Sequence, residues 1–145
     1  MTVKSIDELI KKLKPYAKKA VYVGFPKEHN PDVENGFRMA DLGAVHEFGS
    51  EDGRIPKRPF LRPTVTENSE KYTNLFIKQV RTSTPVPIAL ERISLMVQAD
   101  AVEKINEGNF KPLAPETIAK KGSSKPLIDT GRMRQSIRGI VRDEN

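Results

Sequence analysis

The chain of 145 residues contains no cysteine and no tryptophan. The lack of cysteine excludes disulfides, thiolate metal sites and cysteine nucleophiles. It fits a reducing cytoplasm, although secreted proteins without disulfides also exist. Because the aromatic residues are only six Phe and three Tyr, the core must be mainly aliphatic and thin, and neighbouring subunits could complete part of it.

Long hydrophobic runs are also missing. No uninterrupted apolar stretch approaches the roughly 20 residues that a helix needs to cross a bilayer. The first five residues lead directly into a lysine-rich amphipathic segment, so we predict neither a signal peptide nor a transmembrane segment, and no membrane partner. The length predicts one domain over residues 1–145.

Residue patterns that carry catalysis are scarce. The only histidines are His29 and His46, and neither stands near Asp or Glu at a metal-ligand spacing. His46 and Glu47 are neighbours on a predicted helix, so their side chains point about 100° apart. Glycine-rich phosphate loops and nucleophile-elbow serines are absent. We therefore predict that the chain is not an enzyme and holds neither a metal nor a cofactor.

The positive charge is unevenly placed. The net charge is +6, and residues 109–142 hold eight lysines and arginines against two acidic residues, which accounts for the whole excess. Such a stretch could contact nucleic acid or an acidic protein surface, or could simply keep the protein soluble. Aromatic residues do not alternate with these cations, and signatures of nucleic-acid-binding domains are absent. A basic nucleic-acid-binding accessory protein is therefore kept only as the alternative function.

Hydrophobic periodicity predicts an α+β fold, in which a small, mostly antiparallel β-sheet packs against two long helices. The expected helices cover residues 6–18, 38–48, 63–81 and 85–107, and the expected strands cover 20–25 and 136–142. We expect these two strands to pair. Long flexible loops are expected at 27–37 and 49–58, and an irregular region with one helical turn at 117–121 follows the last long helix.

The first predicted helix is amphipathic. Ser5, with Glu8 three residues later, forms a predicted capping box at its start. Its apolar residues fall on one face, and lysines occupy much of the rest. A helix of this kind could lie on a membrane surface, but we expect it to pack on the domain's own sheet.

Two blocks of sequence carry a specific signal. The first is His46-Glu47-Phe48-Gly49 followed, after a short insert, by Ile55-Pro56-Lys57-Arg58-Pro59-Phe60-Leu61-Arg62-Pro63. The second runs from Lys121 to Ile137 and contains Pro126-Leu127-Ile128-Asp129-Thr130-Gly131. In this order the blocks resemble the virion-morphogenesis and tail-completion proteins of tailed bacteriophages, and Tyr22-Val23-Gly24-Phe25 also fits. The resemblance extends from about residue 20 to residue 137.

The resemblance implies a structural protein of a phage or prophage that acts at the head–tail junction, as a tail-completion or neck component. It implies a homo-oligomer, for which a ring is one expected form. Its implied partners are the head connector and tail-tube proteins. Such a protein would be found in the host bacterial cytoplasm during assembly and in the virion afterwards. Tail completion is the more specific part of this expectation, and the family is the broader part.

Some residues of the two blocks are predicted to contact neighbouring copies, and others are predicted to stabilise the fold. Prolines stiffen residues 54–63, so this arm would lose little entropy on docking to a neighbour. The predicted assembly interface comprises Arg54, Lys57, Arg58, Phe60, Leu61, Arg62, Arg132 and Arg134. The predicted structural motif comprises His46, Glu47, Phe48, Gly49, Pro56, Pro59, Asp129 as a helix cap, and Gly131 for close packing. As an alternative, Phe60 and Leu61 would only staple the following helix to the core.

Overall fold

The computed structural model describes residues 2–107 and 131–145, and it has the α+β fold that the sequence predicts. The expected turn at 117–121 and the expected cap Asp129 lie outside the described residues. The main sheet has two antiparallel strands, β1 (Lys19–Gly24) and β4 (Arg138–Asp143). Their register runs from Lys19 opposite Asp143 to Gly24 opposite Arg138, which confirms the expected pairing.

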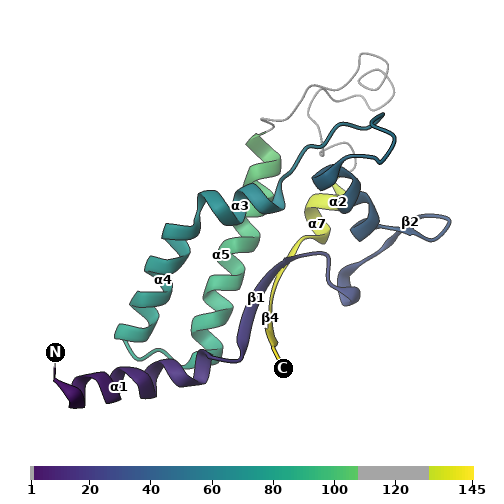
Figure 1. The fold of residues 1–145 in the computed structure, drawn as a ribbon. Helices are drawn as coiled ribbons and strands as arrows, with labels where there is room; N and C mark the ends of the chain where they lie inside the picture. Colours follow the sequence, from purple (N-terminus) through teal and green to yellow (C-terminus); the bar gives the residue numbers. More distant parts are fainter. Residues whose placement is uncertain (1, 108–130) are drawn as a thin grey trace.

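The long helix α5 (Val86–Glu107) is the central element. The sheet packs on it from one side, while α3 (Leu61–Glu67) and α4 (Ser69–Arg81) pack from the other (Figure 1). Strand β4 approaches α5 so closely that a Cβ at Gly139 would lie 1.9 Å from the carbonyl oxygen of Ser94. Only glycine fits this contact, because real Cβ atoms never come so near an oxygen.

The predicted single helix over 63–81 is wrong, because the chain breaks it at Asn68. The side-chain amide of Asn68 donates to the carbonyl oxygen of Thr64 at 2.8 Å. Asparagine side chains compete in this way with the helical ladder, which explains the separation of α3 from α4. Helix α3 also begins at Leu61, earlier than the proline that was expected to start it.

Helix α1 (Val3–Leu13) begins before the predicted capping box. The hydroxyl oxygen of Thr2 accepts the amide of Ser5 at 3.2 Å, so Thr2 and not Ser5 is the cap. The helix runs through a 3-10 turn, η1 (Lys14–Tyr16), into β1. None of its residues is buried, and it extends away from the sheet (Figure 1). The expectation that it packs on the domain's own sheet is therefore wrong.

The stretch predicted as a long loop at 27–37 contains regular structure. A 3-10 turn, η2 (Lys27–His29), precedes a short antiparallel hairpin of β2 (Asp32–Glu34) and β3 (Phe37–Arg38). The hairpin turns at Asn35 and Gly36, which both have positive φ, as is typical of an Asn-Gly turn. It leads directly into α2 (Met39–Phe48).

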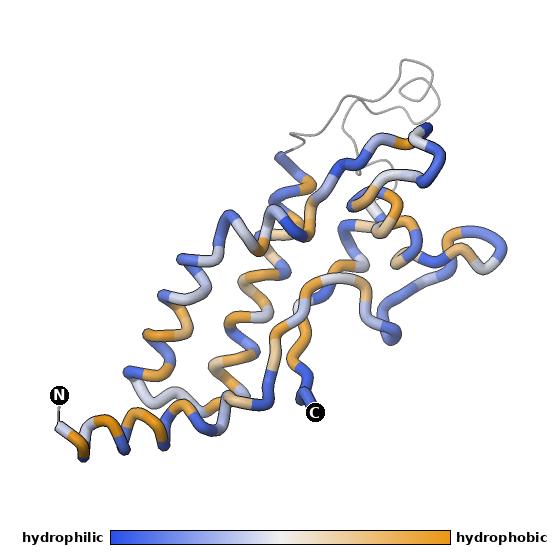
Figure 2. Tube along the Cα trace, in the orientation of Figure 1, coloured by the Kyte–Doolittle hydropathy of each residue, from blue (hydrophilic) through white to orange (hydrophobic). Residues whose placement is uncertain are grey.

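The hydrophobic core beside α2 and α7 (Arg132–Ser136) joins residues that are far apart in the sequence. Helix α7 contributes Met133 to it, and Ile137 follows. The fully or almost fully buried members are Met39, Phe60, Ala101, Ile105, Met133 and Ile137. Figure 2 shows apolar residues recurring along α5, and apolar and polar residues alternating along α1. The two sequence blocks thus meet in one aliphatic cluster around a single phenylalanine.

Candidate assembly interface

Glu47, the second residue of the first block, is buried and caps the start of α3. Its Oε2 atom accepts the backbone amides of Phe60 at 2.8 Å and Leu61 at 3.0 Å, and its Oε1 atom accepts that of Arg62 at 2.8 Å. These amides have no partner within the helix, and a carboxylate also suits the positive end of the helix dipole. Glu47 therefore fixes the proline-rich arm to α2.

Two residues predicted for the assembly interface lie inside the chain's own core. Phe60 is fully buried, and its ring packs edge-on against that of Phe25 with 6.3 Å between the ring centroids. Arg58 is buried, and its backbone amide donates to the carbonyl oxygen of His46 at 2.6 Å. Leu61 is partly buried against the same cluster. For Phe60 the structure supports the alternative, in which the side chain attaches the following helix to the core. Phe60 packs in one cluster with Met39 of α2, and Val23 of β1 lies against this cluster.

The turn between α2 and the arm, residues 49–57, is closed by its own hydrogen bonds. The amide of Ser50 donates to the carbonyl oxygen of Ile55 at 3.0 Å, and the amide of Ile55 donates to the hydroxyl oxygen of Ser50 at 2.8 Å. Gly49 permits this path with a φ of 77°. The stretch 49–58 was predicted as a long flexible loop, and in the structure serine and aspartate side chains bind its backbone as a turn.

Asp52 holds the tip of this turn, which we call the Ser50 turn. Its carboxylate accepts the hydroxyl of Ser50 at 2.7 Å and the backbone amide of Arg54 at 3.0 Å. These hydrogen bonds lower the pKa of Asp52 below its usual value. The guanidinium of Arg54 lies 3.3 Å from the same carboxylate. These contacts of Asp52 therefore fix the backbone at the tip of the turn.

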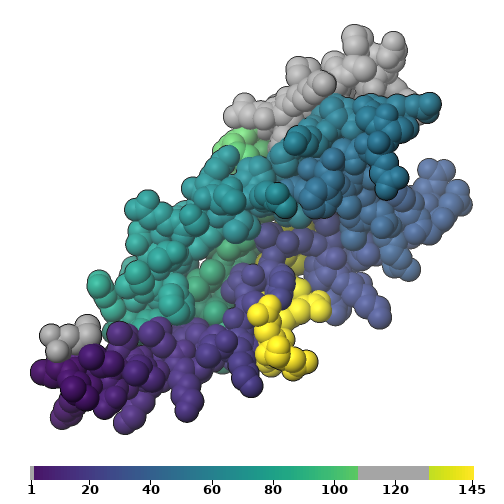
Figure 3. All heavy atoms as spheres, viewed as in Figure 1, coloured from purple at the N-terminus to yellow at the C-terminus, as the bar shows by residue number. Residues whose placement is uncertain are grey.

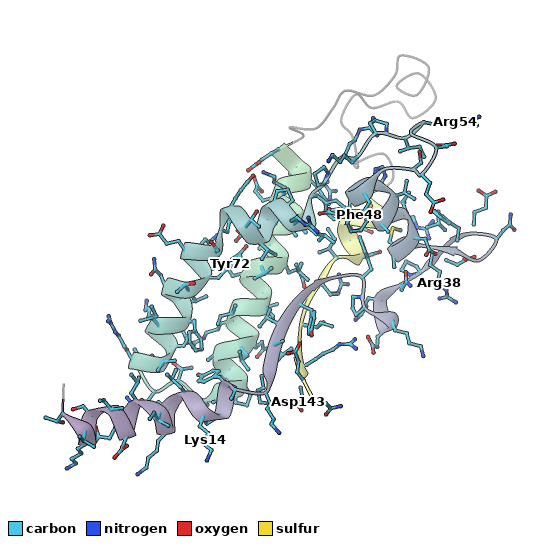
Figure 4. All side chains as sticks on the ribbon, viewed as in Figure 1. Lys14, Arg38, Phe48, Arg54, Tyr72 and Asp143 are labelled. Atoms are coloured by element: carbon cyan, nitrogen blue, oxygen red, sulfur yellow. The ribbon has the colours of Figure 1, made fainter. Side chains whose placement is uncertain are left out.

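The exposed side of the Ser50 turn carries apolar, cationic and acidic groups. Phe48, at its base, is 69% exposed, and Ile55 is also exposed. Arg54, Lys57 and Arg62 remain on the surface, as predicted, while Pro56 and Pro59 are half-buried. In Figure 4, Arg54 stands at the end of the molecule remote from Lys14. The arm thus divides into a buried half that holds α3 and an exposed half that a neighbour can reach.

The arginines of the second block do not share one environment. Arg132 is exposed, and its Nη2 atom donates to the carbonyl oxygen of Asp32 at 2.8 Å. Arg134, which was expected to face outward, is half-buried and donates from Nη1 to Asn106 at 3.0 Å. Gly131 is buried with a φ of 70°, and a Cβ there would make only ordinary contacts. Glycine at this position therefore serves the left-handed backbone rather than close packing.

A second surface was not foreseen from the sequence. An apolar groove of about 520 Å³ lies between residues 21–23 of β1 and the helices α3 and α4. Val65 and Tyr72 form its helical wall, and Ile93 and Val97 of α5 form its floor. Figure 3 shows α5 in green at the bottom of the hollow between α4 and β1. Only the fold brings these segments together, so no local sequence signal marks the groove.

A polar group anchors one wall of the groove. The hydroxyl of Tyr72 donates to Asp100 at 2.8 Å, and the ammonium of Lys71 donates to both oxygens of the same carboxylate. Burial and this hydrogen bond raise the pKa of Tyr72 above its usual value. The hydrogen bond to Asp100 gives the tyrosine hydroxyl a partner within the chain, and the surface of the groove is mainly apolar.

Within residues 2–107 and 131–145, no group of three or more His, Asp or Glu side chains gathers as a metal site. In the same ranges, no helix is both long and apolar enough to cross a membrane. Comparison with known proteins yields no matching family model, no matching curated protein and no matching solved structure.

Proposed function

We propose that the chain is a structural protein of a tailed phage or prophage that acts at the head–tail junction, as a tail-completion or neck component. In this role it works as a homo-oligomeric ring that contacts the head connector on one side and the tail tube on the other. The resemblance of the two ordered blocks to tail-completion proteins supports the proposal. Its task is geometric, so it requires neither a catalytic residue nor a cofactor.

The exposure of Phe48 carries the proposal. Glu47, Phe60 and Met133 of the two blocks are buried in one structural unit, so most of the shared pattern serves the fold. Phe48 belongs to the same pattern, yet it is 69% exposed at the base of the Ser50 turn. Leaving such a side chain in water forgoes about 1.5–3 kcal/mol of burial. Aromatic residues and arginines are both enriched at protein–protein contact sites, and Arg54 lies in the turn that follows Phe48.

Deletion of the gene from an inducible prophage tests the proposal. We expect induced cells to release separate heads and tails, or tails of faulty length, as seen by electron microscopy. Normal infectious particles from the deletion strain would refute the proposal. In particles from the intact strain, mass spectrometry should detect the chain in the virion, and before lysis the chain should be found in the host cytoplasm.

A point variant connects this phenotype to the surface. A plasmid copy of the wild-type gene should restore infectious particles, whereas Phe48→Asp should not, because the charge disrupts an apolar contact without touching the core. Phe37→Asp is the matched control, since Phe37 is an exposed phenylalanine on β3, outside the Ser50 turn. If Phe48→Asp restores particles as well as Phe37→Asp does, the exposed phenylalanine is not part of the assembly surface.

A further inference from the structure

Helix α1 carries an apolar seam that stays exposed within the part of the chain that the structure describes. Val3, Ile6, Ile10 and Leu13 are spaced by three, four and three residues, which is the spacing of a helix that packs against a protein surface. These side chains are between 37% and 75% exposed. A helix of 11 residues is marginal in water on its own, so α1 needs a partner to be stable.

In this arrangement residues 2–107 and 131–145 leave the seam exposed. The ring of Tyr16 in η1 packs edge-on against Phe76 of α4, with 5.0 Å between the ring centroids. This contact fixes the junction, and α1 then runs away from β1 and from the groove that β1 lines (Figure 1). Pairing of two α1 helices is also insufficient, because fewer than two heptads are available on each.

The apolar groove has the properties that the seam requires. Val65 projects from one wall, Val21 from the other, and Ile93 and Val97 form an apolar floor. A helix of 11 residues is about 16 Å long, so the contact is small and should form only when several copies reinforce one another. One opposite-charge pair is also available across the contact, because Asp7 flanks the seam on α1 and Arg62 lines the groove.

From these observations we infer that the α1 seam of one copy docks in the apolar groove of the next copy. The two surfaces differ, so the contact is heterologous and repeats from copy to copy, closing into a ring when the rotation permits. The inference rests on the premise of the proposed function that copies assemble, and it identifies the element that joins them. A membrane surface fits less well, because Asp7 and Glu8 offset most of the positive charge of the lysines on α1.

Cysteine cross-linking tests the contact directly, since the chain has no natural cysteine. Ile10→Cys and Val65→Cys are prepared as separate proteins, mixed and oxidised. We expect a disulfide-linked dimer that contains one chain of each kind. Lys12→Cys, on the opposite side of α1, is the matched control and should give no dimer with Val65→Cys. If both pairs cross-link equally, or neither pair does, the inference is overturned.

A double variant that carries Ile10→Cys and Val65→Cys in one chain separates docking between copies from docking within a chain. A ladder of linked copies supports the inference. An internal disulfide in a monomer overturns it, because α1 would then cover its own groove.

Association constants from sedimentation equilibrium provide a second readout. Ile10→Asp and Val65→Asp should each weaken self-association at least about tenfold, because each places a charge in the apolar contact. Leu95→Asp is the control, since Leu95 is 55% exposed on α5 but does not line the groove. Equal weakening by all three variants, or by none, overturns the inference, while the gene-deletion phenotype still reports separately on the proposed function. A wild-type chain that stays monomeric, or that binds anionic vesicles through Ile10 instead, also overturns it.

Discussion

Replacing Glu47 by glutamine removes the charge that holds the start of α3, and the structure allows the cost to be estimated. One carboxylate oxygen accepts two backbone amides and the other accepts one, at 2.8–3.0 Å. Glutamine retains one accepting oxygen but turns an amide donor toward the remaining backbone N–H. At least one buried donor then loses its acceptor, and the negative charge at the helix start is lost.

The magnitude follows from these contacts. An unsatisfied buried donor costs about 1–3 kcal/mol, and the lost charge at a helix start adds about 0.3–1 kcal/mol. We expect Glu47→Gln to lower the free energy of unfolding by about 2 kcal/mol, and Glu47→Ala, which frees all three amides, by about 4 kcal/mol. Either value is a large part of the roughly 5–15 kcal/mol that stabilises a small protein.

Urea denaturation followed by far-UV circular dichroism measures the effect, because the chain has no tryptophan to serve as a fluorescent probe. Glu103→Gln is the control, since Glu103 is an exposed glutamate on α5 and its change should stay within about 0.5 kcal/mol. If Glu47→Gln is as stable as Glu103→Gln, the three hydrogen bonds do not stabilise α3, and our account of the first sequence block is incorrect.

Three further perturbations follow from individual contacts. Gly139→Ala should lower the free energy of unfolding by about 3 kcal/mol, because its Cβ would meet the carbonyl oxygen of Ser94 at 1.9 Å; an unchanged melting temperature contradicts this packing. Above the usual tyrosine pKa of 10.0, the wild type should lose stability as the pH rises, since the raised pKa of Tyr72 makes the folded state retain the proton longer. Tyr72→Phe should show a smaller alkaline loss in urea titrations, and identical pH profiles refute the role of Asp100. Since the pKa of Asp52 is lowered in the folded state, acid should weaken the Ser50 turn. Asp52→Asn should speed hydrogen exchange of the amides in the Ser50 turn already at neutral pH. Equal exchange in both proteins contradicts this function of Asp52.

The sequence predicted those elements whose signal is local. The β-branched stretch before Gly24 and the alternating residues after Ser136 predicted the two strands and their pairing, which the register confirms. The apolar periodicity of α5 predicted a long buried helix within a few residues of its bounds. These predictions succeed because a strand or an amphipathic helix repeats its pattern every two to four residues.

The errors arose where a single distant or side-chain contact outweighs the local pattern. The helix over 63–81 has continuous helical periodicity, but one hydrogen bond from Asn68 divides it. The start of α1 depends on Thr2 rather than on the capping box that follows it. Arg58 and Phe60 belong to a proline-rich stretch that was predicted to be exposed, yet both are buried in the fold.

By itself, the sequence determined the fold class, the strand pair, the absence of thiol chemistry and the two blocks on which the proposed function rests. Only the tertiary structure decided which of their residues are available to a partner. It buried Phe60, left Phe48 in solvent, turned Glu47 into a cap for a helix that starts 14 residues later, and assembled the apolar groove from β1, α3, α4 and α5. The reason is that exposure depends on what packs above a residue, and those covering segments are distant in the chain.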